Sequence, residues 1–540
     1  MLFAMASTIF GGPKETPPQG PPPKPFKLPA PEDFTLPNGM QVTIVPYGIV
    51  PKLAVRAFVE AGAIDESGGQ VWLSKLTASL MKEGTTTRSG EQVAREAAEM
   101  GGQLEVEAGS DFTSAGGVVL SDFGPKFITL LADVLANPAL PAAELPRLKA
   151  DLVRDLAIDR TEPQTLARER FLKTLFPDHP YGRTFPAESD LQGYAIGDAQ
   201  AFYRNNFAAG RTHLYVAGKL EGDLRRAIQD AFSGWAQGSA APDLPASPVK
   251  ERSLQVIDRP GAAQSNLYMG LPVAAPASQD YITLGVMDSL LGGSFASRIT
   301  SNIREQKGYT YSPNSQVSTR RRLAFWVQVA DVTTAVTGPS LKEIFYEIDR
   351  LRKEPPSAKE LTGIQNYLAG LFVLRNTISP DAIINQLHFV DSQGLDRSYL
   401  STYVQKVMAI QPADIQRIAE TYITPSKMTI VVRGDDTVLE QVTKQLNKLV
   451  DVIEIQDFRD GDYVDRELVM LRVNADSANR SEVMQICDIF RAKIVDVQPK
   501  RLAIEITGNE SKINKFLKLM ENFGISDLTR TGKVAMARVE

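Results

Sequence analysis

The spacing of hydrophobic residues along the chain alternates between the period of a helix and that of a strand, and each change of period marks a new element. Apolar residues recur at helical spacing in five segments and alternate with polar residues in two others. The helical segments are 70–83, 89–101, 122–135, 141–160 and 164–175, and the strand-like segments are 53–61 and 103–120. Ahead of them, β-rich runs flank Pro37-Asn38-Gly39, where Asn-Gly supplies the positive φ angles of a tight hairpin. We therefore expect an α+β domain that begins near residue 34.

The same cycle of strands and helices occurs twice. A Pro- and Ser-containing linker lies at 238–250, and a second series of strands and helices begins at Leu254. The segments 202–232 and 419–446 both contain a helix end, a connector, an apolar strand, a Gly turn and an amphipathic helix. This repetition predicts two related α/β halves.

The last part of the chain has a different pattern, in which strands and helices follow one another in the order βαββαβ. The predicted strands are 464–473, 493–497, 501–507 and 533–538, and the predicted helices are 480–491 and 510–522. This order is typical of a small ferredoxin-like domain. We therefore expect a separate C-terminal fold.

Composition and charge exclude several classes of protein. The chain is 43% hydrophobic, and Lys plus Arg number 59 against 64 Asp plus Glu, a net charge of −5 that lacks the basic excess expected of a nucleic-acid partner. The single cysteine, Cys487, excludes an internal disulfide and is expected to be a buried hydrophobe. No pair among His179, His213 and His388 has ligand spacing, so structural roles are expected. The run Arg320–Arg322 is expected to form a solvated sheet edge.

The N-terminal stretch predicts neither a membrane span nor an intact secretory signal. The apolar first ten residues have no Lys or Arg before them, and nine prolines between Pro13 and Pro31 predict an extended linker. No apolar run reaches the length of about 18 residues that a spanning helix needs. Cytoplasm is the default compartment, with the periplasm or export as the alternative if this start is a truncated signal peptide.

Motifs in both halves resemble the pitrilysin/insulinase-type family of inverted zinc peptidases. They are FTLPNGMQV at 34–42, FVEAGAIDE at 58–66, KEGTTTRSG at 82–90, HPYG at 179–182, DRPGAAQS at 258–265 and GGSFASRITSNIREQKGYTYS at 292–312. In active members of this family, a helix before a Gly-Thr pair carries H-x-x-E-H. Its histidines hold zinc on one helical face, and its glutamate is the general base.

The corresponding helix in this chain has lost the motif. Counting back from the Gly-Thr pair at 84–85 places Lys75, Ala78 and Ser79 at the three positions. A Lys ammonium has no lone pair for a metal, alanine has no carboxylate, and serine is a poor zinc ligand. The acidic ligand that the resemblance implies would fall near Asp155, which alone cannot replace two imidazoles. We expect this chain to bind no metal.

A second family feature is retained. In paired-subunit members, the non-catalytic subunit contributes an Arg and, seven residues later, a Tyr that face the substrate. Arg304 and Tyr311 have this spacing, with Arg304 in the last turn of a predicted helix ended by Gly308 and Tyr311 on the next strand. The resemblance implies that both donate hydrogen bonds to a peptide carbonyl. Alternatively, Arg304 is a helix C-terminal cation and Tyr311 a half-buried strand aromatic.

From about Met428 the sequence resembles the small regulatory subunit of acetolactate synthase. Residues 428–458 resemble the second half of its ACT domain, and 464–539, with FRAKIVDV, EITGNESKI and DLTRTGK, resemble its C-terminal domain. The strand, helix and strand that form the family's valine site do not precede Met428, so that site is expected to be absent. Because 428–446 also completes the second half, we assign it there. The overlap arises from a gene fusion or from an artefact of sequence assembly.

These patterns predict an α+β chain of two related peptidase-like halves followed by a partial ACT segment and a small ferredoxin-like βαββαβ domain. The expected divisions are an apolar start and Pro-rich linker at 1–33, a first half at 34–237, a linker at 238–250, a second half at 251–446 and the acetolactate synthase-type domain at 459–540.

Three functions follow from the resemblances. The first is a non-catalytic subunit that holds peptide for a zinc-bearing peptidase subunit. The second is a regulatory subunit of acetolactate synthase, which binds the catalytic subunit in branched-chain amino-acid biosynthesis. The third, an independent zinc metallopeptidase, is the weakest, since no set of zinc ligands exists. Zinc or thiamine diphosphate is expected only in the partner subunits.

Overall fold

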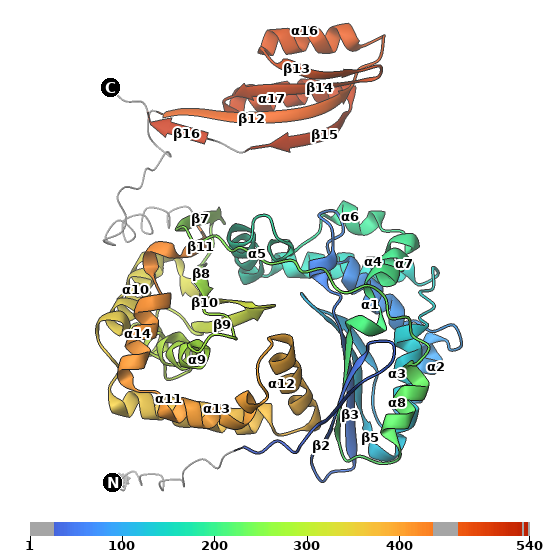
Figure 1. Ribbon diagram of the computed structural model, residues 1–540. Coiled ribbons are helices and arrows are strands. Elements are labelled where there is room, and N and C mark those ends of the chain that lie inside the picture. Colours follow the sequence, from blue (N-terminus) through green and yellow to red (C-terminus); the bar gives the residue numbers. More distant parts are fainter. Residues whose placement is uncertain (1–25, 436–462, 532–533, 538–540) are drawn as a thin grey trace, which may run out of the picture. The chain divides into compact units, whose positions relative to one another are not determined.

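The computed structural model describes residues 26–435, 463–531 and 534–537. The chain divides into two compact units, Met1–Asp451 and Val452–Glu540 (Figure 1). The helix predicted over the end of 419–446 lies outside the described residues. No helix among the described residues combines the length and apolar character that crossing a membrane requires.

The described part of the first unit contains two sheets, and the second repeats the strand order of the first except for the edge strand β1. The first sheet has the order β1-β2-β6-β3-β5-β4 and the second has the order β7-β11-β8-β10-β9. The first comprises β1 (Glu32–Thr35), β2 (Gln41–Pro46), β3 (Lys52–Val59), β4 (Glu105–Ala108), β5 (Thr113–Leu120) and β6 (Thr212–Gly218). The second comprises β7 (Ser253–Asp258), β8 (Gln264–Val273), β9 (Asn314–Arg320), β10 (Leu323–Thr333) and β11 (Thr429–Gly434).

The internal repeat predicted from the sequence is confirmed by the position of the last strand in each half. Strand β6 runs parallel to β2 and antiparallel to β3, and β11 runs parallel to β7 and antiparallel to β8. In each half, therefore, the strand from the end of that half lies between the two strands from its beginning. Because β11 completes the second sheet, residues 429–434 belong to the peptidase-like half, as expected.

The predicted hairpin at the start of the first half forms, although of Asn38 and Gly39 only Gly39 takes a positive φ. Strands β1 and β2 pair antiparallel, and Gly39 takes a φ of 84° in the turn between them. The Asn38 side-chain amide donates to the carbonyls of Phe232 and Trp235, at 2.8 and 3.0 Å. The turn is thereby joined to the end of the half.

The helices of the first half follow the predicted segments closely, whereas segment 103–120 forms two strands, β4 and β5, instead of one. The first-half helices are α1 (Leu73–Lys82), α2 (Gly90–Glu99), α3 (Gly124–Ala136), α4 (Leu145–Thr161), α5 (Pro163–Leu175), α6 (Glu188–Gly193), α7 (Ile196–Asn206) and α8 (Leu224–Phe232). The second-half helices are α9 (Tyr281–Asp288), α10 (Thr337–Lys353), α11 (Ala358–Leu371), α12 (Pro380–Ser392), α13 (Ser398–Ala409) and α14 (Pro412–Tyr422).

Each half packs one helix against the sheet of the other half. Helix α5 buries Phe171 in a cluster with Tyr268 and Phe325 of the second sheet. Helix α12 buries Leu387 in a cluster with Tyr215 of the first sheet. In Figure 1, α12 lies beside β3 and α5 lies beside β7 and β11. Because both faces of each sheet are covered, the central strands β3 and β8 are buried along most of their length.

A polar network joins the two halves beside α12. Arg397 donates to Asp33 at 2.6 Å and to Asp391 at 3.1 Å, and the Tyr215 hydroxyl donates to Asp391 at 2.9 Å. His213 lies next to this network, with its Nδ1 2.9 Å from the Tyr215 hydroxyl. The network spans β1, β6 and the loop after α12, so it links residues far apart in the sequence.

Among its described residues, the second unit has one sheet and two helices, with one strand more than predicted. Its elements are β12 (Tyr463–Asn474), α16 (Arg480–Phe490), β13 (Lys493–Gln498), β14 (Arg501–Gly508), α17 (Glu510–Met520), β15 (Ile525–Arg530) and β16 (Val534–Ala537). The missed strand, β15, pairs with the second part of β12, while the expected last strand, β16, pairs with its start. Cys487 is buried in the core, and burial raises the pKa of its thiol to about 11.

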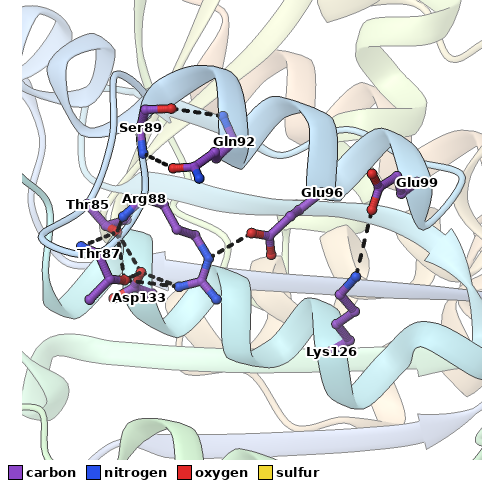
Figure 2. A network of polar contacts seen from close by, with 9 residues as sticks. All are labelled: Thr85, Thr87, Arg88, Ser89, Gln92, Glu96, Glu99, Lys126 and Asp133. Carbon is purple, nitrogen blue, oxygen red and sulfur yellow. Dashed lines mark hydrogen bonds and ion pairs between the residues drawn. The ribbon is translucent and has the colours of Figure 1, made fainter.

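A cluster of polar contacts holds the turn after α1 against α3 (Figure 2). Asp133 accepts hydrogen bonds from Thr85 at 2.6 Å, Thr87 at 3.0 Å and Arg88 at 2.6 Å. Burial acts to raise the pKa of Asp133, but hydrogen bonds from Thr85, Asn137, Thr87 and Arg88 outweigh it and hold that pKa below its usual value. The ionised carboxylate is therefore the form that the folded chain favours.

Replacing Asp133 with Asn should lower the free energy of unfolding of the first unit by about 2 kcal/mol at pH 7, because the charged acceptor is lost. Since the pKa is depressed on folding, the stabilisation is present above the unfolded pKa of about 3.9 and is lost as the pH falls through the folded value. Urea unfolding of Asp133→Asn and the wild-type chain at pH 7 and at pH 3 measures both effects.

Glu99→Gln is the matched control, because Glu99 pairs with Lys126 at 4.0 Å on the exposed surface of the same region. It should change stability by less than about 0.5 kcal/mol. A difference between wild type and Asp133→Asn that does not shrink at low pH would contradict the assignment.

Candidate functional site

Helix α1 carries the three positions that correspond to the zinc motif. Lys75 and Ser79 lie one turn apart on the more exposed side of the helix, while Ala78 is 2% exposed and belongs to the core. The helix begins after Trp72, which takes a left-handed φ of 72°. The side chain of Glu66 accepts hydrogen bonds from the backbone N–H groups of Trp72 and Ser74, at 3.1 and 2.8 Å, and so caps the helix start.

Lys75 places an ammonium group where active relatives have a zinc-binding imidazole. Its Nζ lies 3.9 Å from the centre of the Trp72 ring. Partial burial of the ammonium group lowers the pKa of Lys75, although the side chain as a whole is exposed, and the carboxylates of Asp159, Glu66 and Asp155 oppose that change. Both Asp155, where an acidic ligand was expected, and Asp159 are on α4. The site therefore retains the acidic residues Asp155 and Asp159, but Lys75 places a positive charge near them.

The three histidines lie elsewhere, in structural settings. His388 stacks on Phe58 with ring centres 3.6 Å apart, and burial lowers its pKa to about 3. Burial also lowers the pKa of His213, to about 4. His179 accepts a hydrogen bond from the backbone of Tyr181 at 3.2 Å. Across the part of the chain that the structure describes, no three His, Cys, Asp or Glu side chains are grouped so as to hold a metal ion.

Arg304 and Tyr311 come together, and the structure adds a third residue that the sequence analysis missed. The Arg304 guanidinium lies 4.4 Å from the ring centre of Phe295 and 5.1 Å from that of Tyr311. Phe295 and Tyr311 are 69% and 79% exposed, although aromatic side chains usually bury most of their surface. A cation thus lies between two exposed rings. We refer to Phe295, Arg304 and Tyr311 as the aromatic–Arg cluster.

The position of Tyr311 differs from the prediction. It lies in the segment between the helical turn Thr300–Gln306 and β9, which begins only at Asn314, and so it is not on a strand. The expectation that Gly308 ends the helix is confirmed by its φ of 65°. The placement of Tyr311 on a strand, which both interpretations shared, and the half-burial that the alternative gave it are therefore wrong, whereas Arg304 does lie in the last turn of the helical segment.

The segment that carries the aromatic–Arg cluster is anchored at two points. Arg298 donates two hydrogen bonds to Glu360, at 2.7 and 3.0 Å, which tie the segment to α11. At Gly292 the backbone passes so close to β9 and β10 that a Cβ would lie 2.6 Å from the side chains of Ser315 and Gln328. Only glycine fits this close approach, so Gly292, three residues before Phe295, has a packing role.

The basic run at the β9–β10 turn is solvated only in part. Arg322 is exposed and takes the left-handed φ of 57° that the tight turn requires. Arg320 instead packs against the rings of Tyr181 and Phe325, at 5.8 and 5.5 Å, and burial lowers the pKa of its guanidinium. The prediction of a fully solvated edge is wrong for Arg320, because α5 and the turn after it cover this end of the sheet.

Four family models match successive parts of the chain. The model described as Insulinase (Peptidase family M16) matches residues 50–187, and the Peptidase M16 inactive domain matches 196–368. The AHAS small subunit-like ACT domain matches 403–454, and the Small subunit of acetolactate synthase matches 466–539. The described part of the ACT match contains most of α13, all of α14 and β11, which the structure places in the second peptidase-like half.

Curated relatives match the tail. A probable acetolactate synthase small subunit of Methanothermobacter thermautotrophicus is 54% identical over 114 residues, which are 21% of this chain and 68% of the relative. The acetolactate synthase small subunit of Aquifex aeolicus is 50% identical over 114 residues, 21% of this chain and 59% of the relative. The chain therefore spans about two thirds of the length of these relatives.

Solved structures match the first unit. A peptidase M16 inactive domain from Pseudomonas fluorescens has a TM-score of 0.69 and 22% identity, covering 75% of this chain and 98% of that one. A protease from Helicobacter pylori has a TM-score of 0.70 and 19% identity, covering 76% of this chain and 100% of that one. At this identity the match establishes the fold of the two halves.

The donor chemistry of α1 predicts how the chain responds to zinc. Zinc should not raise the melting temperature of the wild-type chain, because Lys75 and Ser79 cannot replace imidazoles. The double variant Lys75→His, Ser79→His should gain a zinc-dependent rise, since two histidines one turn apart can bind one ion and metal binding stabilises the native state. Thermal unfolding with and without zinc measures both, and Lys75→His alone is the control. A zinc-dependent rise in the wild-type chain would contradict this account.

Proposed function

Because the chain belongs to the peptidase M16 family over its two halves and to the acetolactate synthase small-subunit family over its tail, we propose that it is a peptide-holding, non-catalytic subunit with a regulatory tail. The observation that carries the first part of this proposal is the aromatic–Arg cluster. Phe295 and Tyr311 are exposed and Arg304 is half-buried beside them, while α1 carries Lys75, Ala78 and Ser79 in place of the two imidazoles and the carboxylate of the zinc motif.

The aromatic–Arg cluster has the chemistry to hold a peptide backbone. The Arg304 guanidinium and the Tyr311 hydroxyl are hydrogen-bond donors that suit a peptide carbonyl, and they suit it better as that oxygen gains negative charge. The ring of Phe295 limits the conformations of Arg304, which lowers the entropy lost on binding. The zinc ion and the general base would come from a separate subunit with an intact H-x-x-E-H helix, and this chain would supply positioning.

The tail supports the second part of the proposal. Residues 466–539 match the acetolactate synthase small subunit, and the second unit has its own hydrophobic core. We propose that this unit binds the catalytic subunit of acetolactate synthase, the thiamine-diphosphate enzyme of branched-chain amino-acid synthesis, and raises its activity. Since β11 is part of the peptidase-like sheet, a complete valine-binding ACT domain is not available, and the activation should not respond to valine.

Two properties of the intact chain bear on this combined role. A peptide that spans residues 421–464, found by mass mapping of protein from the native source, would establish that one cell makes the whole chain. Cell fractionation of the same source would place it: recovery with acetolactate synthase activity in the cytoplasm supports the regulatory role, while recovery in an exported fraction opposes it.

The peptide-holding role predicts that Arg304→Ala lowers peptide cleavage by the reconstituted pair with a zinc-bearing subunit by about 10- to 100-fold, because a donor to the peptide carbonyl is lost. Tyr311→Phe should retain the ring contact and lose only the hydroxyl contribution. Arg95→Ala is the control, as Arg95 lies on the exposed surface of α2. Cleavage that is indifferent to Arg304→Ala would refute the assigned role.

The regulatory role predicts that the full chain binds the acetolactate synthase catalytic subunit and raises its rate of acetolactate formation. The chain cut after Asp451, which ends the first compact unit, should do neither, because it lacks the matching domain. A pull-down measures binding. A rate assay without valine and with about 10 mM valine, a concentration that would fill even a weak site, measures activation and the response to valine. Equal activation by both chains would exclude the tail as the cause.

A further inference from the structure

A cavity lies next to the former zinc-motif helix and is not part of the aromatic–Arg cluster. Its volume is about 210 Å³, and its lining comes from α1, the β4–β5 turn, α5, the turn after α5 and the end of β9. The elements come from both halves of the first unit. Arg320 is the contribution of the second half, and it reaches the cavity because α5 and the turn after it pack against the second sheet.

Four cations line this cavity: Lys75, Arg168, Arg183 and Arg320. Arg183 donates to the backbone carbonyl of Glu66 at 2.6 Å, and Arg320 donates to the backbone carbonyl of Thr319 at 2.8 Å. The ammonium of Lys75 faces the Trp72 ring. None of these contacts brings a carboxylate to the cation, so they fix the positions of the charges without neutralising them.

The single carboxylate in the lining is committed elsewhere. Glu66 is 4% exposed, and its two oxygens accept hydrogen bonds from Trp72 and Ser74 at the start of α1. Burial raises its pKa to about 7, so near neutral pH it carries only part of a charge. Asp111, Asp155 and Asp159 exert an electrostatic influence on the cations, but they lie outside the cavity lining.

The rest of the lining is mixed: Ser74, Ser110 and Thr184 are polar, and the larger side chains are apolar or aromatic. Val71, Trp72, Leu172 and Tyr181 add hydrocarbon and aromatic surface beside the cations. Since one water takes about 30 Å³ in the liquid, the cavity has room for a carboxylate and part of one residue, but not for a whole peptide. A free inorganic anion would use the cations and leave the apolar surface unused.

We propose that the cavity between Lys75, Arg168, Arg183 and Arg320 binds the C-terminal carboxylate of a peptide, with the last side chain against Trp72 and Leu172. The ammonium of Lys75 would then attract a peptide end at the place where active relatives position zinc. This inference rests on the proposed peptide-holding function and names its substrate class, a peptide with a free C-terminus.

The test compares a short fluorescent peptide that ends in leucine as the free acid with the same peptide as the C-terminal amide, by anisotropy on the full chain. The free acid should bind at least about tenfold more tightly, and added salt should reduce this preference. Lys75→Met and Arg320→Gln should each reduce the preference to about twofold. Lys75→Met keeps the test interpretable if Arg320→Gln perturbs the fold, because the Lys75 side chain is exposed.

Two controls separate this inference from the proposed function. Arg95→Gln removes an exposed cation far from the cavity lining and should leave the preference unchanged. Arg304→Ala should weaken both peptides alike and keep their ratio; if it has no effect on either while the preference persists, the role of Arg304 fails and the cavity assignment stands.

Three results would overturn the proposal. The first is equal binding of the acid and the amide, and the second is a preference that survives both cavity substitutions. The third is displacement of both peptides by inorganic phosphate without any discrimination between them. The last result would assign the cavity to free anions.

Discussion

The reciprocal packing of one helix from each half on the sheet of the other is the interaction on which the first unit depends. Without α5, the Tyr268 and Phe325 face of the second sheet would be exposed to water, and without α12 so would the Tyr215 face of the first. Burying apolar surface of this kind is worth about 25 cal/mol per Å². The two halves therefore share their cores and fold as one compact unit, although the sequence divides them clearly.

The contacts of α1 explain why it is a well-formed helix although it lacks the zinc motif. Ala78 lies in the core of the first half, and Glu66 and the Thr85–Asp133 contacts hold the two ends of α1. These contacts need no metal. Replacing the histidines changes only the side of α1 that carries Lys75 and Ser79, so the chemistry could be lost while the packing was retained.

The junction with the tail is decided by strand pairing. Residues 429–434 resemble two families, but they make a parallel ladder with β7 and an antiparallel ladder with β8 at once. A central strand with partners on both sides is stabilised by twice the hydrogen bonding of an edge strand. The described part of the C-terminal unit starts at β12, and its core around Val483, Ile504 and Phe516 includes no residue of β11.

The sequence by itself determined most of the elements, the repeat and both resemblances, because these depend on local periodicity and on short motifs such as Asn38-Gly39; it did not show that 103–120 forms two strands or that β15 exists. It also placed Arg304 and Tyr311 seven residues apart. It could not reveal the contact of Arg304 with Phe295, the burial of Arg320, or the meeting of Lys75 with Arg168 and Arg183 around one cavity. The burial of Arg320 depends on how α5 and the turn after it pack against the second sheet, and the other contacts depend on how separate turns and helices meet; such packing leaves no periodic signal in the chain.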